Sequence, residues 1–409
     1  MNNKYAMRFP RVVLGFLTSL ASGVLLTWSY YREPLLQLFP TWTTSDLSLI
    51  FSVHNIVVSV MMAVAGFTVK KISTRLTYSL VAICLFVGLG GFYFLPVNNP
   101  DLAYIMAFAM YGVIAPMGVG ASCLLNYSLY PAWYPERSGM VSGTMIMAFN
   151  TCALITGAIA GAMIPSYGIQ TTLLVTGILV AVLTLLSVPF GVYPGPNDHL
   201  PPKPVRPENK SSKDYTLPEM LKTAGFWVLF IYHAMIFGVG LILADHAAGI
   251  ALSFGIAALF GLLFSPAKGV SCLAIGWLMD KLSTIGAMLV IDGLVIVSAL
   301  VLLLCTGVAS SSVLVLIGLI LCGLGVGGVS SIKASAIRFL YGSKNYEQNY
   351  GFCNLNIAIS AILVYLASML IEAMGGSYQG VFVVIMGIGV LALGCTVYLH
   401  FFIKRFNSK

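Results

Sequence analysis

Twelve apolar runs of about 20 residues follow one another along this chain. A helix of that length crosses the hydrocarbon core of a bilayer, so each run predicts one membrane span. The composition agrees, because 59% of the 409 residues are hydrophobic and only 8% are charged, whereas soluble domains carry about 25% charged residues. We therefore expect an all-α polytopic membrane protein. The predicted spans cover residues 12–31, 47–69, 76–96, 102–130, 139–164, 170–192, 224–245, 250–279, 284–307, 311–340, 350–372 and 378–403.

Lysine and arginine residues are distributed very unevenly between the two ends of these spans. If both termini are cytoplasmic, 18 of the 21 cations lie on the cytoplasmic side and only Arg32 lies on the other. This is the distribution that the positive-inside rule requires. We therefore expect a multi-pass protein of the cell membrane with both termini in the cytoplasm. Topology also explains the net charge of +8, so we expect no nucleic acid partner.

The residue patterns that support enzyme chemistry are missing from the sequence. All eight cysteines lie within predicted spans, and none forms a CxxC motif or a Cys/His cluster, so neither disulfides nor a metal site is indicated. The chain also lacks a P-loop and paired catalytic carboxylates. We expect no enzymatic activity, no metal and no cofactor.

Residues 193–223 form the only long polar stretch inside the chain, and they are rich in proline and in charges of both signs. Proline stiffens a segment and removes hydrogen-bond donors, which favours a linker. Six predicted spans precede this stretch and six follow it. We therefore predict an amino-terminal six-helix bundle (1–192), a cytoplasmic linker (193–223) and a carboxy-terminal six-helix bundle (224–409). A glycine one turn before a charged loop recurs at 66–71 and 276–281, as expected for a duplicated unit.

The six-plus-six pattern, the central basic loop and the sequence Gly276-Trp-Leu-Met-Asp280-Lys281 together resemble the major facilitator superfamily. The resemblance implies two six-helix bundles that give alternating access to a site between them, in a monomer embedded in the lipid bilayer. It also implies a gating role for Asp280 and Lys281. The match is partial, because Lys70 replaces an acidic residue in the first copy of the motif and Ser283 replaces a glycine in the second.

Scattered motifs over most of the chain are similar to those of the oxalate/formate antiporter family. The resemblance implies exchange of small carboxylates. An arginine that neutralises the dicarboxylate in that family falls on Cys272 here, and a family lysine falls on Ile357. Because both family cations are absent, a substrate with one carboxylate fits better than oxalate. The motifs are Thr27-Trp28-Ser29, Trp133 to Gly139 followed by Ser142-Gly143, Lys213 to Met220, Phe226-Trp227, and Asn349 to Phe352.

Two cations, Lys268 and Lys333, remain inside the predicted spans. Lys268 lies twelve residues before Asp280, which places it about 18 Å from the helix end and close to the midplane. It projects from the same helical face as Cys272. A lysine at that depth costs a few kcal/mol unless it faces a cavity or a partner, so we predict that Lys268 binds the substrate. Pairing with Asp245, at the predicted end of the seventh span, and snorkelling to the surface are the alternatives.

Lys333 and Asp292 lie at matching depths in neighbouring spans. We predict that they form a structural or gating ion pair, because breaking a buried pair costs more than keeping it. Snorkelling of Lys333 and direct substrate contact are alternatives. His233 and His54 are the only groups at useful depth that titrate near neutrality. Packing is the preferred interpretation for both, with proton coupling as the alternative.

Polar and aromatic residues on helices that line the cavity, by the resemblance, complete the predicted site. Each is also a candidate for a hydrogen bond between helices. We predict a secondary active transporter, of antiporter type by the resemblance, that moves a small organic anion of the monocarboxylate type by alternating access. Efflux of a neutral or amphipathic compound, or sensing of a metabolite without transport, are the alternatives. The predicted substrate-binding residues are Lys268, Trp28, Tyr31, Asn55, Asn150, Tyr232, His233, Cys272, Asn354 and Asn356.

Overall fold

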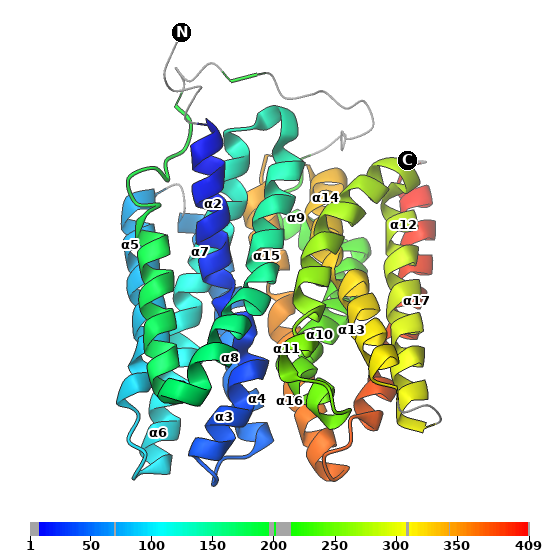
Figure 1. The fold of residues 1–409 in the computed structure, drawn as a ribbon. Coiled ribbons are helices and arrows are strands. Elements are labelled where there is room, and N and C mark those ends of the chain that lie inside the picture. Colours follow the sequence, from blue (N-terminus) through cyan, green and yellow to red (C-terminus); the bar gives the residue numbers. More distant parts are fainter. Residues whose placement is uncertain are drawn as a thin grey trace.

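A computed structural model describes residues 8–68, 71–195, 200–201, 214–307, 311–342 and 344–407. Long helices run side by side through the molecule, and α2 begins at the same face at which α17 ends (Figure 1). We call this the terminal face and the opposite one the far face. The far face carries the ends of α3, α4 and α16, at the bottom of Figure 1.

The first half of the chain contains six spans, several of which combine α-helix with 3₁₀ or π-helical turns. The first span joins α2, η1 and α3, the third joins α5, η2 and η3, and the fourth joins α6, η4 and α7. The elements are α2 (Arg8–Ser22), η1 (Gly23–Thr27), α3 (Trp28–Leu38), α4 (Thr44–Thr68), α5 (Thr74–Leu85), η2 (Phe86–Gly90), η3 (Gly91–Phe94), α6 (Pro100–Ala107), η4 (Phe108–Ile114), α7 (Ala115–Ala132), η5 (Pro135–Arg137) and α8 (Ser138–Leu185).

The second half also contains six spans and begins with the short helix α9. This helix starts with a capping box between Thr216 and Glu219, which satisfies free backbone donors at a helix start. The elements are α9 (Leu217–Leu221), α10 (Ala224–Ser253), α11 (Ala258–Gly261), α12 (Phe264–Gly307), α13 (Ser312–Gly327), α14 (Val329–Tyr341), α15 (Tyr346–Cys353), α16 (Asn356–Ala373) and α17 (Gln379–Asn407).

Eleven stretches of the described residues are long and apolar enough to cross a membrane. One of them, Met140–Leu185, has 46 residues and contains a backbone break at Gly168, so it supplies two spans. Together with the predominance of helix, this confirms the predicted twelve-span, all-α fold. The helix α12 likewise contains two spans, which are separated at Ser283.

Gly168 and Ser283 adopt almost the same backbone conformation at these two turns. Gly168 has φ 75° and ψ 168°, and Ser283 has φ 73° and ψ 167°. This region is essentially restricted to glycine, because a Cβ atom is crowded there. Ser283 is the only non-glycine residue with positive φ in the described part of the chain. Its turn is therefore strained, while the turn at Gly168 is relaxed.

The boundary between the seventh and eighth spans differs from the prediction. The helix α10 continues to Ser253, eight residues beyond the predicted end. Asp245 and His246 consequently lie inside a helix and are buried. The first span also runs on, through Arg32 to Leu38. Hydropathy places charged residues at span ends, so it could not anticipate charges that are buried with partners.

The two halves of the chain pack together along α4 with α16 and along α8 with α12. Glycines permit the second contact, because Gly143 of α8 faces Leu273 and Gly269 of α12 faces the backbone of Met147. A Cβ atom added at either glycine would meet these neighbours at unusually short distances. Small residues at helix contacts are typical of membrane bundles, where close packing drives association.

Candidate substrate site

Lys268 lies near the middle of the eighth span, roughly 15 Å along the helices from Ala258 at the far face. Its side chain is 6% exposed. The Nζ atom lies 5.0 Å from the centre of the Phe237 ring and beside Gly240 of α10. Among the described residues, the Lys268 ammonium has no hydrogen-bond or ion-pair partner. Within the described part of the chain it is a buried cation without a counter-charge.

Glycines on two neighbouring helices make room for Lys268. Gly323 and Gly327, one turn apart on α13, face the backbone nitrogen and oxygen of Lys268 so closely that a Cβ on either would collide with α12. Gly240 of α10 leaves space beside the ammonium group itself. Because α13 packs against one side of the Lys268 backbone, the Lys268 side chain is directed towards α10.

Lys333 is the second buried cation and comes from α14. Its Nζ atom donates to Asn354 Oδ1 at 2.7 Å and to Asn356 Oδ1 at 3.4 Å. It also lies 5.9 Å from the centre of the Phe237 ring and 5.7 Å from that of Tyr350. The two lysines therefore share one aromatic ring. A ring face attracts a cation, but neither the ring nor an amide carries the full negative charge that would balance the lysine.

The predicted ion pair between Asp292 and Lys333 is not formed. Asp292 accepts a hydrogen bond from Thr396 of α17 at 2.6 Å and lies beside Tyr232. Lys333 instead faces α15 and α16. The two residues were expected to pair because their depths match. Depth fixes the height of a residue along a helix but not the direction in which its side chain points.

The alternative pairing of Lys268 with Asp245 is not formed either. Asp245 accepts the Arg32 guanidinium at 2.8 Å. Asp245 and Asp292 are the two buried carboxylates in the described part of the chain, and both have other partners. Lys268 and Lys333 are therefore two buried cations that lack a carboxylate partner among the described residues.

Both histidines that were considered for proton coupling contact backbone carbonyl groups. The two ring nitrogens of His233 lie 2.7 Å from the carbonyl oxygen of Leu229 and 3.1 Å from that of Val329, so this residue connects α10 with α14. Nδ1 of His54 lies 3.0 Å from the carbonyl oxygen of Tyr111. Among the described residues, the hydrogen-bond contacts of both histidines are therefore with backbone carbonyl groups and not with a carboxylate.

The other predicted binding residues divide between the site and the surrounding helices. Asn354 and Asn356 hold Lys333, and Cys272 donates to the Gly327 carbonyl at 3.0 Å. Tyr232 lies beside Asp292, and the Trp28 ring centre lies 4.2 Å from that of Tyr111, with the two rings tilted by 33°. Tyr31 is buried near Thr176. Asn55 and Asn150 each donate to their own helix, to the Phe51 and Ile146 carbonyls. The side chains of Asp280 and Lys281 lie outside the described residues.

Phe237 is the site residue that sequence analysis missed. An aromatic residue in an apolar span predicts lipid contact or packing as readily as a binding site. Its role is visible only from the two ammonium groups near its ring. The signal in the sequence is indirect, since Gly240 follows one turn later and opens space on the same face.

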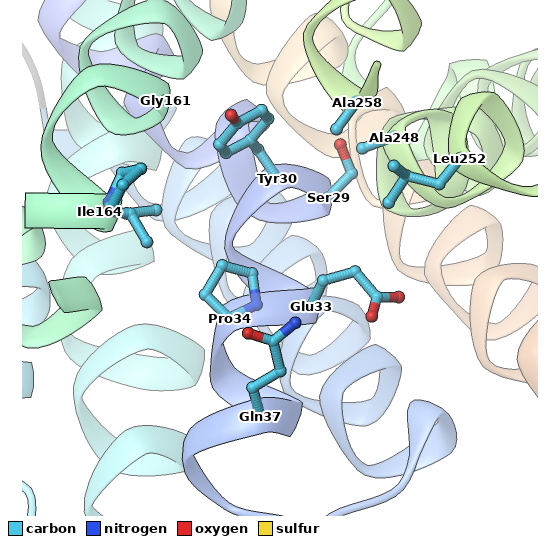
Figure 2. Close-up of a pocket in the computed structure, with 11 residues that line it drawn as sticks. Ser29, Tyr30, Glu33, Pro34, Gln37, Gly161, Ile164, Ala248, Leu252 and Ala258 are labelled. Carbon is cyan, nitrogen blue, oxygen red and sulfur yellow. The ribbon is translucent and has the colours of Figure 1, made fainter. Parts of the chain in front are cut away.

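A cavity of about 180 Å³ opens between the two halves towards the far face. Figure 2 shows Ala248, Leu252 and Ala258 on one side of it and Ile164 on the other. Its one charged lining residue is Glu33. A carboxylate repels an anion, so this cavity does not substitute for the two-lysine site.

Twelve spans around a buried, polar site at mid-depth define a polytopic transporter rather than an enzyme. The chain belongs to the Major Facilitator Superfamily, because the model of that family matches residues 12–365. This confirms the superfamily resemblance that the sequence motifs suggested.

Two curated relatives are similar over most of their length. An uncharacterized MFS-type transporter, YhjX of Escherichia coli (strain K12), is 24% identical over 368 residues, covering 88% of this chain and 87% of the relative. The oxalate:formate antiporter of Oxalobacter formigenes is 23% identical over 350 residues, covering 84% and 80%.

Solved structures of transporters share the fold. The D-xylose-proton symporter superposes with a TM-score of 0.68 at 14% identity, covering 97% of both chains. The nucleoside transporter NupG superposes with a TM-score of 0.64 at 13% identity, covering 98% of this chain and 99% of the other. At these identities the likeness concerns the fold alone.

Proposed function

We propose that this protein exchanges a small organic anion of the monocarboxylate type, with Lys268 as the counter-charge. The observation that carries the proposal is the burial of Lys268 without a carboxylate partner among the described residues. An ammonium group in a membrane interior is costly, so a retained one points to a charged ligand. The similarity to an oxalate:formate antiporter supports exchange as the mode of transport.

Alternating access follows from two units that move against each other. We assign residues 1–192 and 224–409 to two six-helix bundles, joined by the linker 193–223, in a chain that acts as a monomer. The two halves contact each other along α4 with α16 and along α8 with α12. The lysine and arginine distribution supports a cytoplasmic terminal face and a far face outside the cell membrane.

The position of Lys333 affects how many negatively charged or polar groups the substrate can have. The preference for one carboxylate came from the absence of both family cations. Lys333 adds a second buried ammonium group, since it donates to Asn354 while Asp292 accepts from Thr396. The site then offers one free ammonium group at Lys268 and one held by two amides at Lys333. A carbonyl, hydroxyl or second carboxylate of the substrate would find a donor at Lys333.

Uptake of labelled pyruvate, lactate, formate and oxalate into proteoliposomes tests the proposal. We expect saturable uptake that increases when the vesicles contain unlabelled substrate. Inhibition by uncharged hydrophobic compounds but not by carboxylates would favour efflux of a neutral compound instead. Stabilisation by a ligand without accumulation would favour a sensor. No uptake of any anion by folded protein would contradict the proposal.

A further inference from the structure

A buried charged cluster joins the two halves close to the far face. Arg32 of α3 pairs with Asp245 of α10 at 2.8 Å, and its guanidinium also donates to the Asp245 carbonyl at 3.1 Å. Arg32 lies 2.9 Å from Nδ1 of His246 and donates to the Thr44 carbonyl at 3.2 Å. Asp245 is fully buried, eight residues before the end of α10 and so about 12 Å from it.

Two serines close this cluster into a ring of hydrogen bonds. Nε2 of His246 lies 2.9 Å from Ser368 Oγ of α16, and Ser368 donates to Ser48 Oγ of α4 at 2.6 Å. Ser48 in turn donates to the Asp245 carboxylate. Four of its contacts join the two halves: Arg32 with His246, Ser368 with Ser48, Ser48 with Asp245, and Asp245 with Arg32. We call Arg32, Ser48, Asp245, His246 and Ser368 the far-face latch.

The hydrogen-bond pattern fixes the charge of His246 in the closed latch. A guanidinium group can only donate hydrogen bonds. The nitrogen that faces Arg32 must therefore be an acceptor, which makes His246 neutral with its proton on Nε2. Nε2 of His246 then donates to Ser368, Ser368 donates to Ser48, and Ser48 donates to Asp245. The Arg32 charge is balanced by that of Asp245.

A proton added to the latch destabilises its closed form at either titratable group. On Asp245 it removes the negative charge that Arg32 requires. On His246 it places an N–H and a positive charge against the guanidinium. Either change leaves the buried cluster with one uncompensated positive charge, even though Nε2 of His246 also lies 3.3 Å from the Asp245 carboxylate.

The other titratable groups around Asp245 do not offer a substitute charge. Tyr111 of η4 and Tyr378, whose ring lies 5.9 Å from that of His246, are neutral near physiological pH. Glu33 follows Arg32 and is exposed in the cavity of Figure 2. Asp46 and Glu372 lie at the exposed rim, where they bind the backbone of Thr43 and Ser45.

We propose that Asp245 and His246 form a proton-binding site, and that a proton taken up there from the outside releases the far-face latch and opens the far face. The inference uses the orientation proposed above but does not depend on the substrate. A ligand shifts a conformational equilibrium by its preference for one state, and here the proton prefers the open state. External acidity would therefore promote access from outside.

Labelling of a cysteine behind the latch tests this inference in intact cells. Val364 is fully buried on α16, one turn deeper than Ser368, which donates to its carbonyl. In a Val364→Cys variant, a membrane-impermeant maleimide reaches the thiol from outside only when the latch is open. Asn98→Cys, on an exposed connection between α5 and α6, corrects for the pH dependence of the reaction. The parent protein gives the background from the eight native cysteines.

We expect the labelling ratio of Val364→Cys to Asn98→Cys to rise about tenfold between about pH 7.5 and about pH 5.5 outside. Adding Asp245→Asn should give a high ratio at both pH values, while adding Glu372→Gln should leave the pH response intact. The same ratio at both pH values in the latch-intact protein would overturn the proposal, even if Asp245→Asn fails to fold. Failure of Asn98→Cys to react with the maleimide from outside would also overturn the proposal. The labelling experiment uses no substrate. A failure of anion transport in the proteoliposome experiment would therefore leave its outcome unaffected.

Discussion

Two clusters of buried charge in this protein are built in opposite ways. In the far-face latch, the Arg32 cation meets the Asp245 carboxylate directly. In the substrate site, Lys268 and Lys333 share the Phe237 ring and have no carboxylate partner among the described residues. The first cluster is electrically complete and joins the two halves. Under the proposed function, the second becomes complete when an anion binds. Both clusters are buried, and the presence or absence of a counter-charge is what distinguishes them.

Removing one charge from the latch should produce the largest loss of stability. Asp245→Asn leaves Arg32 buried and unpaired, which costs about 4 kcal/mol. The double variant Arg32→Gln/Asp245→Asn should recover at least half of this loss, because it removes both charges. Thermal unfolding in detergent measures both values. If the double variant loses as much stability as Arg32→Gln and Asp245→Asn lose in sum, the two residues act independently.

Removing one charge from the candidate substrate site should increase the stability of the protein rather than decrease it. Lys268→Leu removes a buried cation without a counter-charge, so we expect stabilisation by about 2 kcal/mol. The same unfolding measurement in the absence of substrate provides the comparison. Destabilisation similar to that of Asp245→Asn would mean that Lys268 has a structural counter-charge.

Lys333 should control the second contact of the substrate. We expect Lys333→Gln to raise the KM of a dicarboxylate about tenfold, as loss of one buried charged contact predicts, and that of a monocarboxylate less. Asp292→Asn is the matched control, since Asp292 binds Thr396 instead, and it should leave both KM values unchanged. A large effect of Asp292→Asn on KM would restore the coupling between Asp292 and Lys333 that the contacts do not show.

Substitutions at the Gly168 and Ser283 turns should have the smallest effect on stability. This effect involves no charge. Ser283→Gly relieves backbone strain and should stabilise the protein by about 1 kcal/mol. Its hydroxyl contact with the Gly286 amide is long, at 3.4 Å, so little is lost. Gly168→Ser should destabilise by a similar amount, and no atom lies within 4 Å of the added Cβ. Equal stability of all three proteins would contradict the assignment of strain.

The twelve spans could be predicted because hydropathy and helix length are local properties. The far-face latch could not, because Asp245 and His246 interrupt an apolar run and read as a loop. Their burial depends on Arg32, which is more than 200 residues away in the sequence. Partners that are so far apart in the sequence cannot be identified from local hydropathy.

The substrate site was predicted in part. The depth of Lys268 follows from its distance to a recognisable helix end, and the amides on the eleventh span followed from their polarity. The direction of Lys333 could not be obtained, since helix rotation depends on packing against neighbours. Phe237 was missed for the same reason. Without the two ammonium groups, its ring is one apolar side chain among many.

Uptake of a labelled carboxylate by Lys268 variants tests the central claim most directly. Wild type, Lys268→Arg and Lys268→Gln are reconstituted at equal density, and folding is checked by thermal unfolding. We expect saturable exchange in the wild type, reduced exchange in Lys268→Arg, and a loss of about 100-fold or more in Lys268→Gln, as removal of one partner of a buried charge pair predicts. Unchanged exchange in a folded Lys268→Gln protein would contradict the assignment of Lys268 as the counter-charge.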